Sequence, residues 1–440
     1  MDARAAHAVR RAELGARIAS NGAISLGKGT ASNLFRYQPR RGTGARLDLS
    51  AFRNILSVDA GERLLDVEGL ATFESVVDRT LPFGLAPLIT PELKHITVGG
   101  AFVGIGIESN CFRYGFVHDA MVEADVLLPD GRIVTCSPNG EHADLFHALP
   151  NSYGTLGYVL RARMRLMPTM PFVHLRTTAF RDPDVFLDAM REAAEHGDAD
   201  FIEGLVYGRD RLLLTLSRYV REVPRVDDIL RRHVFYRLVS EPGDVYLTAR
   251  DYLFRYDPDW FWNFPESERW QLVRRFAPAA VRHSAFYRRW IGLRERLGWQ
   301  PDDGKEFLIQ DWEVPWEHAE DMLRAALAEV DLEGKPWMTT AIRTQHSPTL
   351  YPVRPRSLYF NLGCYCRVRR AEGAEDHHHT RQLDRRCFEL GGIKMLYSST
   401  FLPEDEFWRI YGGERYRALK AKYDPERRLP TLYEKCVQGV

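Results

Sequence analysis

The chain has 440 residues, 45% of them hydrophobic and 12% aromatic, which is enough for a sizeable core and more than one core ordinarily serves. Lysine plus arginine and aspartate plus glutamate both number 60, so the net charge gives no reason to expect a nucleic-acid partner. We therefore expect two domains and no binding of nucleic acid.

The cysteines and the N-terminal residues bear on the compartment. Six cysteines are few for this length, and they show neither paired zinc spacing nor a disulfide framework, which fits a reducing compartment. They are Cys111, Cys136, Cys364, Cys366, Cys387 and Cys436. The first twenty residues lack the apolar core of a signal peptide, and no segment reaches the roughly 18 apolar residues of a membrane span. We expect a cytoplasmic protein, soluble or peripheral on the inner face of the cell membrane.

The N-terminal part predicts a domain of short strands with few long helices. A helix is expected over residues 2–18 because the pair Asn21-Gly22 follows it as a stop signal. Runs rich in β-branched residues and separated by turns such as "DAGE" and "PDGR" predict strands, and "FESVVDRTLPFG" predicts a short helix that ends at a proline. The strand-like runs lie in residues 23–30, 45–52, 55–71, 117–138 and 154–168.

A second region begins after residue 168. "PDVFLDAMREAAEHG" has the spacing of an amphipathic helix, and strands are expected over 201–208 and 211–220. Strands over 306–315 and 357–366 flank another helix, and the tail returns to helix. We predict an α+β protein with a first domain over 1–168, a substrate or cap domain over 169–395, and a C-terminal segment over 396–440 that returns to the first domain.

The run "TVGGAFVGIGIESN", residues 97–110, has four glycines and no charge before Glu108. The missing Cβ atoms allow positive φ angles and close contact by a flat or phosphorylated ligand. The run matches neither the dinucleotide fingerprint nor the Walker loop, so a tight turn between strands is the alternative.

Two further loops favour the ligand. "SLGKGTASNLFR" offers a second phosphate-binding loop upstream, and "NSYGTLGYV" places two glycines around Thr155 before a strand. Three glycine-containing loops in one β-rich domain are what an extended dinucleotide such as FAD requires. We expect backbone N–H groups of these glycines to contact its pyrophosphate and ring.

The order of several blocks resembles a known family. "TVGG", "YG", "LPDGRIV", "DLFHAL" and "GTLGYV" resemble the PCMH-type FAD-binding domain of the vanillyl-alcohol oxidase flavoproteins. "PELKHITVGGAFVGIGIES", "FIEGLVYG", "IQDWEVP", "LYFNLGCY" and "KMLYSSTFLPEDEFW" resemble one branch, the Δ24-sterol reductases of the Diminuto/Dwarf1 type. The resemblance runs from about Gly27 to Lys435 and implies a PCMH-type FAD-binding fold with an α+β cap domain.

The resemblance also implies cofactors and partners. FAD is expected to be non-covalent, because the first loop has neither the His nor the Cys through which some relatives attach it; His95 is expected to be an exposed loop residue. Eukaryotic sterol enzymes carry an N-terminal membrane segment that is lacking here, so we expect a bacterial relative. "RDYLFRYDPDWFWNF" resembles bacterial members that act on methyl-branched fatty acyl chains after a lipid methyltransferase. We therefore expect a lipid substrate, NADPH as reductant, and a lipid methyltransferase or a reductase as partner protein.

Carried over residue by residue, the resemblance and the glycine loops give the expected FAD contacts. They are Lys28, Gly29, Thr30, Asn33, Pro91, Glu92, Thr97, Val98, Gly99, Gly100, Gly104, Gly106, Ile107, Glu108, Ser109, His118, Gly154, Thr155, Gly157, Tyr158 and Val159.

The catalytic candidates come from the cap. The resemblance implies Tyr397 as the acid or base and Lys394 as the group that polarises the flavin, the alternative for Tyr397 being a core tyrosine. In "IQDWEVP" the alternation puts Gln310 on one face and Asp311 on the other, and one face is expected to look at the flavin. A buried Asp311 would be a proton donor with a raised pKa, and a surface carboxylate is the alternative. Glu203 has the same two interpretations.

Three other features bear on membrane contact, metal binding and packing. Eight arginines and one acidic residue between Arg269 and Trp299, with interleaved aromatic rings, suit an anionic membrane surface, and a solvated helix face over the cap is the alternative. Adjacent histidines in "DHHHT" rarely converge on one ion, so we expect no metal. Cys364 and Cys366 fall on one strand face and are expected to pack.

The sequence therefore predicts an FAD-dependent oxidoreductase that reduces or desaturates a carbon–carbon bond of a hydrophobic lipid, such as a methyl-branched or methylene fatty acyl chain or a sterol side chain. The alternatives are an oxidase or dehydrogenase of a polar alcohol or hydroxy acid, and a flavin-free lipid-binding protein.

Overall fold

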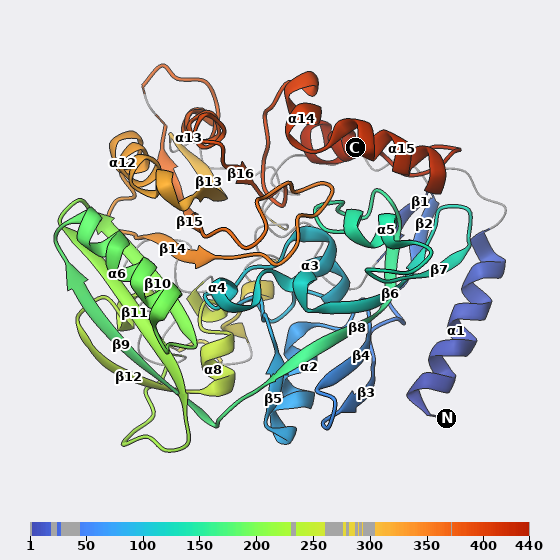
Figure 1. Cartoon of the computed structure of the whole chain (residues 1–440), viewed down its shortest axis with the longest axis horizontal. Helices are drawn as coiled ribbons and strands as arrows, with labels where there is room; N and C mark the ends of the chain where they lie inside the picture. The colour runs from blue at the N-terminus through green and yellow to red at the C-terminus, as the bar shows by residue number, and fades with distance from the viewer. Residues whose placement is uncertain are drawn as a thin grey trace.

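The computed structural model describes residues 2–18, 24–27, 45–229, 235–259, 276–278, 281–286, 289, 293, 304–370 and 372–439. Within these residues, helices and two large antiparallel sheets give the expected α+β fold (Figure 1).

The first sheet is built from residues 55–168. Its strands run in the order β3 (Ile55–Asp59), β4 (Leu64–Glu68), β8 (Tyr158–Pro168), β6 (Met121–Leu127) and β7 (Ile133–Cys136), and β5 (Leu85–Pro87) pairs with β8. All of these pairings are antiparallel. A separate parallel pair joins β1 (Ile24–Gly27) to β2 (Ala45–Asp48).

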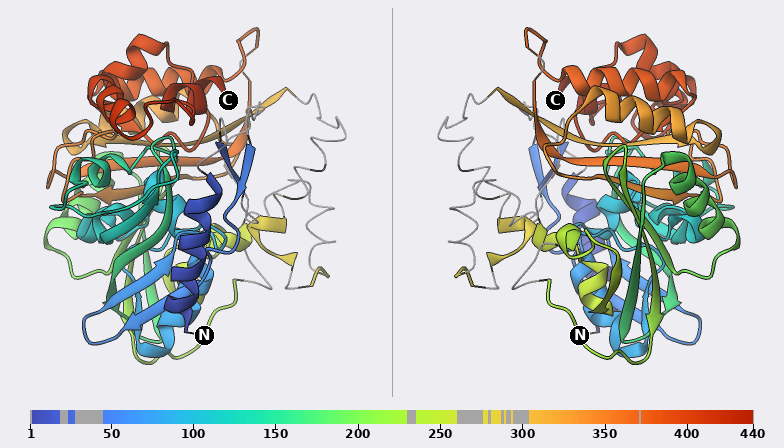
Figure 2. Two further views of the ribbon diagram at one scale, coloured as in Figure 1. Left: turned by 90° about the vertical axis from the view of Figure 1, so that its right-hand side faces the viewer. Right: turned by 90° about the vertical axis from the view of Figure 1, so that its left-hand side faces the viewer.

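In the described part of the chain, one long helix and four short ones accompany this sheet. They are α1 (Ala3–Ile18), α2 (Phe73–Thr80), α3 (Val98–Gly104), α4 (Cys111–Tyr114) and α5 (Ala143–Ala148), with 3₁₀ turns η1 (Leu81–Phe83) and η2 (Val117–Ala120). Helix α1 lies alongside the first sheet (Figure 2), where His7 hydrogen-bonds Glu68 on β4 at 2.8 Å.

The glycine run forms helix α3, where the sequence predicted either a turn or an open loop. Thr97 caps it, since its Oγ1 accepts the Gly100 N–H at 3.2 Å. Helix α3 then packs directly on the sheet, because a Cβ at residue 99 would lie 2.9 Å from the Gly69 carbonyl and 3.2 Å from Val159 Cβ. Close packing therefore compensates for the low helix propensity of glycine.

The second sheet is built from residues 172–394. Its strands run in the order β12 (Gly243–Thr248), β9 (Phe172–Phe180), β11 (Arg211–Val220), β10 (Phe201–Gly208), β14 (Trp337–Ile342), β15 (Tyr359–Arg369), β13 (Lys305–Pro315) and β16 (Ile393–Lys394). The first sheet thus ends at Pro168 and the second begins at Phe172. The predicted domain limits themselves stay a prediction.

The two faces of the second sheet differ. Helices α6 (Pro183–His196), α12 (Ala319–Glu329) and α13 (His378–Glu389) cover one face and form an apolar core with side chains such as Trp312 and Leu362 (Figure 1). The turn η4 (Trp316–His318) leads into α12. The opposite face packs on the first domain, because Phe201 and Leu205 of β10 share one buried cluster with the strands of that domain.

The C-terminal segment returns to the first domain. Helices α14 (Glu404–Ile410) and α15 (Gly413–Tyr423) lie near α5 (Figure 1), and a π-helix, η5, spans Glu434–Gln438. Lys420 Nζ donates to the Thr155 carbonyl at 2.7 Å and pairs with Asp424 at 2.7 Å. Lys422 and Tyr423 both contact Asp144 on α5. Two short helices of the cap, α7 (Phe235–Leu238) and α8 (Ala249–Leu253), lie on either side of strand β12 in the chain.

Two remaining expectations concern the cysteines and the membrane. All six cysteines are buried and unpaired by disulfides, and Cys364 and Cys366 lie on the helix-covered face with their sulfurs 3.3 Å apart. Among the described residues, no helix combines the length and the apolar composition needed to cross a membrane.

Candidate functional site

The structure describes two of the three loops that are expected to bind FAD. Lys28, Gly29, Thr30 and Asn33 lie outside the described residues. The central run and the third loop are described, and both lie around helix α3: the Tyr153 N–H donates to the Val103 carbonyl, and the Val117 N–H donates to the Gly106 carbonyl.

The N–H groups at the start of α3 are used inside the protein. Those of Val98 and Gly99 donate to the carbonyls of Ala71 and Gly69, at 2.9 and 2.7 Å, and that of Gly100 donates to Thr97. The expectation that these glycines direct their N–H groups at a pyrophosphate therefore fails for Gly99 and Gly100. Gly99 allows close approach of the helix to the sheet, whereas a Cβ at Gly100, which is exposed, would meet only the Thr97 side chain that caps the helix.

The other glycines of the expected site are also required by packing. A Cβ at Gly106 would lie 2.6 Å from Val117 Cγ2 and 3.1 Å from Pro91 Cγ. Gly154 and Gly157 have φ angles of 78° and 147°, and a Cβ at Gly157 would meet the Leu127 carbonyl at 2.8 Å. By contrast, a Cβ at Gly104 would be in ordinary contact with the Tyr153 ring. Packing or backbone conformation therefore accounts for glycine at residues 106, 154 and 157 without a ligand, but not at residue 104.

Buried polar atoms give independent support for a bound cofactor. Within the described residues, Thr90 Oγ1, both ring nitrogens of His118, Asn151 Oδ1 and Ser152 Oγ are buried and have no hydrogen-bond partner. Burial lowers the pKa of His118, so its ring is neutral at pH 7. Buried polar groups normally have partners, so unsatisfied atoms in loops around one helix fit a polar cofactor that supplies them. These residues would hold the cofactor from the side of α3.

The remaining FAD candidates lie close by in different settings. Thr155 is used internally, since its Oγ1 donates to the Ser152 carbonyl at 2.8 Å. Tyr158 and Val159 begin strand β8, and Val159 contacts Gly99. His95 is half-buried rather than exposed, and its ring lies 5.3 Å from that of His283.

A cluster of hydrogen-bonded polar side chains lies on the face of the second sheet that packs on the first domain. Asp311 on β13 faces Gly363 across the strand pair, and a Cβ at residue 363 would lie 2.5 Å from Asp311 Oδ1. The hydroxyls of Tyr365 and Tyr397 both donate to Asp311 Oδ2 at 2.5 Å. Asn361 donates to Asp311 Oδ1 at 3.2 Å. We call Asp311, Tyr365 and Tyr397 the acid triad.

The carboxyl of the acid triad is buried, and its two tyrosines are partly exposed. Asp311 is 2% exposed, so the surface alternative is wrong, while Tyr365 and Tyr397 are half-buried. Burial raises the pKa of Asp311 to about 6, against the lowering effect of the two tyrosine hydroxyls and Asn361. Burial and the Asp311 charge raise the pKa of both tyrosines well above their usual range. Near neutral pH, therefore, Asp311 is the triad member that gains and loses a proton.

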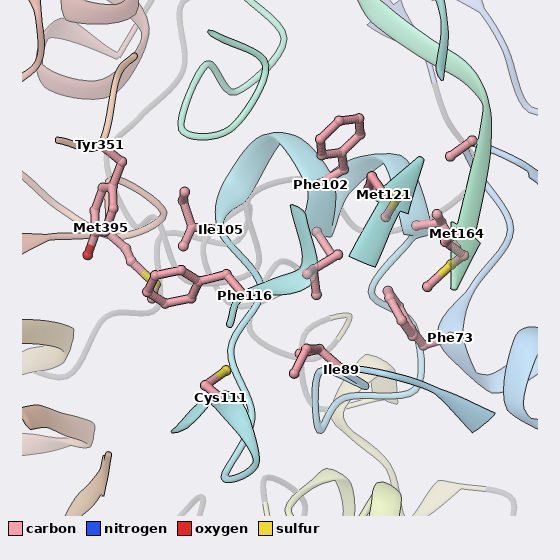
Figure 3. Packing of buried hydrophobic residues seen from close by; sticks show 14 of the residues in the cluster. Phe73, Ile89, Phe102, Ile105, Cys111, Phe116, Met121, Met164, Tyr351 and Met395 are labelled. Carbon is pink, nitrogen blue, oxygen red and sulfur yellow. The ribbon is translucent and has the colours of Figure 1, made fainter. Parts of the chain in front are cut away.

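Next to the triad, the cap contacts the first domain. Tyr351 donates to Glu313, two residues beyond Asp311, and burial raises the pKa of Glu313 to about 8. The ring of Tyr351 lies 5.9 Å from that of Phe116, edge to face. Figure 3 shows Tyr351 and Met395 of the C-terminal half against Phe116 of the first domain. This apolar contact closes the interface beside the triad.

Two catalytic candidates lie on the other face of the sheet. Lys394 is fully buried and pairs with Asp384 of α13 at 3.0 Å, and it also donates to the Ser399 carbonyl. Gln310 contacts the Ser398 hydroxyl and the Ser399 carbonyl. Both residues therefore support the loop that carries Tyr397, and the structure places neither beside the acid triad.

The sequence did not single out Arg255, which is fully buried at the domain interface. Its guanidinium donates to both oxygens of Glu108 at 2.8 and 3.2 Å, to Glu203 at 3.0 Å and to Glu92 at 3.1 Å. Ser109 also contacts it, at 3.2 Å. Glu108 and Ser109, expected at the cofactor, are thus bound to Arg255, and Glu203 is 6% exposed rather than on the surface. The aromatic residues around Arg255 in the sequence were the available sign of its burial.

Comparisons with known proteins agree with this architecture. A family model described as an FAD binding domain matches residues 17–137. The Δ(24)-sterol reductase of Homo sapiens is 26% identical over 410 residues, covering 88% of this chain and 76% of that protein. The enzyme of the same name from Pisum sativum is 24% identical over 446 residues, covering 91% and 77%. Cytokinin dehydrogenase 9 of Oryza sativa subsp. japonica is 32% identical over 156 residues, covering only 35% of this chain and 30% of that protein. The chain is therefore a flavoprotein with a PCMH-type FAD-binding domain, an FAD-dependent oxidoreductase homologous to the Δ24-sterol reductases over most of its length.

Proposed function

We propose that this protein reduces an isolated carbon–carbon double bond of a hydrophobic lipid. The observation that carries the proposal is the acid triad: a titratable carboxyl behind two tyrosine hydroxyls, on the sheet face toward the FAD-binding domain. Bound FAD, once reduced, supplies a hydride to one carbon of the double bond. The protein must then provide a proton for the other carbon.

Tyr397 is the proton donor in this proposal. When Asp311 is protonated, its hydroxyl donates to a tyrosine oxygen, and the Tyr397 O–H points at substrate instead of at the carboxylate. Proton transfer from Tyr397 to carbon is then balanced by transfer from Asp311 to the Tyr397 oxygen. Gly363 provides the space for the Asp311 carboxyl, and Gln310 and Lys394 hold the segment that carries Tyr397.

The substrate class rests on the relatives. The long matches are to proteins named Δ(24)-sterol reductase, which supports reduction over desaturation and a sterol side chain as the substrate to test first. A methylene-bearing fatty acyl chain of a phospholipid is the second substrate class, on the resemblance to bacterial members. NADPH is the proposed source of reducing equivalents.

We also propose a membrane contact through residues 269–299. Among the described residues of this segment, Phe276, Phe286 and Leu293 are 84%, 41% and 48% exposed. Exposed apolar side chains among arginines suit insertion at an anionic lipid surface. Changing Phe276 and Phe286 to serine should weaken binding to phosphatidylglycerol vesicles without loss of FAD, and unchanged binding would contradict the contact.

Comparing lipid extracts of host cells with and without the gene tests the reaction. Mass spectrometry should show one unsaturated lipid species lowered and its partner, heavier by two hydrogens, raised. A change in the opposite direction would establish a desaturase. No change in any lipid, together with rapid bleaching of the flavin by a hydroxy acid or alcohol, would favour a polar substrate instead.

A further inference from the structure

Asn361 is a buried amide between two carboxyls on the sheet face that carries the acid triad. It lies on β15 directly opposite Glu313 of β13, and it is 4% exposed. Its Nδ2 donates to Glu313 Oε1 at 2.9 Å and to Asp311 Oδ1 at 3.2 Å. An amide nitrogen carries two hydrogens, so each carboxyl engages one of them.

Glu313 fixes the direction in which this amide points. Glu313 Oε1 and Asp311 Oδ1 are both acceptors for the Asn361 nitrogen. Turning the amide over would set its carbonyl oxygen against two carboxyl oxygens, and both hydrogen bonds would be lost. Glu313 is itself held at its other oxygen, because the Tyr351 hydroxyl donates to Oε2. The donor end of Asn361 therefore faces Asp311.

The two oxygens of Asp311 consequently have different partners. Oδ1 accepts the Asn361 N–H, whereas Oδ2 accepts the Tyr365 and Tyr397 hydroxyls at 2.5 Å. If Asp311 took up a proton on Oδ1, its O–H would compete with the N–H of Asn361, and one donor would face another. The proton is therefore directed to Oδ2, beside the Tyr397 oxygen that must receive it.

The groups around the two carboxyls separate their titrations. Burial raises the pKa of Asp311 to about 6 and that of Glu313 to about 8, so Glu313 keeps its proton where Asp311 loses one. Glu92 of the first domain feels the Asp311 charge, and burial raises its pKa as well. The neighbouring tyrosines and cysteines, from β15, α4, α13 and the loops, have pKa values that burial raises well above their usual range. They are Tyr351, Tyr365, Tyr397, Tyr411, Cys111 and Cys387.

We propose that Asn361 is the positioning residue of the acid triad: it reserves Asp311 Oδ1 as an acceptor, so that the acid proton lies on Oδ2 beside Tyr397. Glu313, neutral at pH 6, anchors the amide. Asn361 itself neither gains nor loses a proton. The value of this arrangement for catalysis rests on the proposed reduction, whereas the hydrogen bonds are properties of the resting protein.

Infrared titration of the Asp311 carboxyl tests the hydrogen bond without turnover. The band of the neutral carboxyl is obtained by subtracting, at each pH, the spectrum of the same holoprotein with Asp311→Asn. The Asn361 N–H stabilises the carboxylate more than the acid. Asn361→Leu, which has a similar shape and no donor, should therefore move the midpoint from about 6 upward by about one pH unit. Asn361→Ser, which keeps a single donor, should give a smaller upward shift.

Thr340→Val is the matched control for these variants. Thr340 pairs with Asn361 on the neighbouring strand β14, is 7% exposed, and donates its hydroxyl to the Ile202 carbonyl at 2.8 Å. The control removes a buried hydrogen bond from the same cross-strand row, but one that goes to the backbone. It should lower stability and leave the midpoint at about 6. A midpoint that stays unchanged in both Asn361 variants, or that Thr340→Val shifts equally, would overturn the proposal.

Kinetics test the role in proton transfer. With the flavin reduced in advance and the lipid saturating, Asn361→Leu should reoxidise roughly 2- to 12-fold more slowly than wild type at pH 5, because the proton is no longer held on Oδ2. The midpoint of its pH profile should rise together with the infrared midpoint. A wild-type rate at pH 5 would overturn the positioning role. If wild-type protein reduces no alkene although the infrared midpoint shifts as expected, the proposed function fails and the assignment of the hydrogen bond stands.

Discussion

Replacing Gly363 by alanine perturbs the acid triad through one added methyl group. Its Cβ would lie 2.5 Å from Asp311 Oδ1, where ordinary contact begins at 3.4 Å, so the carboxylate must move by about 0.9 Å. The move lengthens the two 2.5 Å hydrogen bonds from Tyr365 and Tyr397. In the active form Asp311 is neutral, and a neutral hydrogen bond contributes ~0.5–1.5 kcal/mol, so losing its contact with Tyr397 should slow proton transfer roughly 2- to 12-fold.

The assay is anaerobic reoxidation of chemically reduced flavin by the alkene substrate, measured from pH 5 to 8. Gly208→Ala on β10 is the matched control, because the nearest atom to its Cβ would be Asp210 Oδ1 at 3.8 Å. Both variants should bind one FAD per chain. A Gly363→Ala protein with the wild-type rate and pH profile would refute the role given to Asp311 and its tyrosines.

Three further predictions follow from buried charges. Because protonated Asp311 is the active form, the rate of flavin reoxidation should fall as pH rises through about 6. Asp311→Asn should lower the rate and remove this dependence on pH. If the variant keeps the same dependence, another group must be the one that titrates. Burial raises the pKa of Glu313 from 4.5 to about 8, so the folded protein binds more protons than the unfolded chain in this window and stability falls with pH. Glu313→Gln should remove ~1.4 kcal/mol per pH unit of that fall, measured by urea unfolding between pH 5 and 8, and parallel slopes in both proteins would contradict the burial argument. Lys420→Met leaves the buried Asp424 without its cation and the Thr155 carbonyl without its donor, so it should lower the free energy of unfolding by ~3–5 kcal/mol. The control Lys422→Met breaks an exposed pair with Asp144 and should lower it by less than ~1 kcal/mol. Similar losses in both variants would show that Lys420 does not hold the C-terminal segment.

Local patterns predicted the strands and longer helices well. From Asp311 to Val314 strand β13 alternates charged and apolar residues, so Asp311 and Trp312 fall on opposite faces, as the period of two requires. Helix α6 follows its amphipathic spacing and the Asp182 cap. Helix α3 was not predicted, because three glycines in seven residues have low helix propensity. Only the distant Gly69 and Val159 make the helix the better packing.

The sequence identified single residues of the site, but it did not reveal which residues far apart in the chain contact one another. Tyr397 and Asp311 were named separately, but their hydrogen bond depends on how strand β13 meets a loop 86 residues later. Tyr365 lay within a quoted block and went unnamed, since its register with Asp311 is a property of strand pairing. Arg255 is one of many arginines, and its carboxylate partners lie 52 to 163 residues away. Lys394 was assigned to the flavin from the family resemblance alone, and its strand of two residues is too short for an alternating pattern to reveal which face the side chain occupies.

The central claim is that reduced FAD in this protein saturates an isolated double bond of a hydrophobic lipid. The most direct test is to mix the anaerobically reduced protein with a Δ24-sterol or with a methylene-bearing phospholipid, following flavin absorbance and the mass of the lipid together. The account predicts that one of these lipids reoxidises the flavin and gains two hydrogens in equal amount. A flavin that stays reduced with both lipids, while the protein is folded and loaded with FAD, would contradict it.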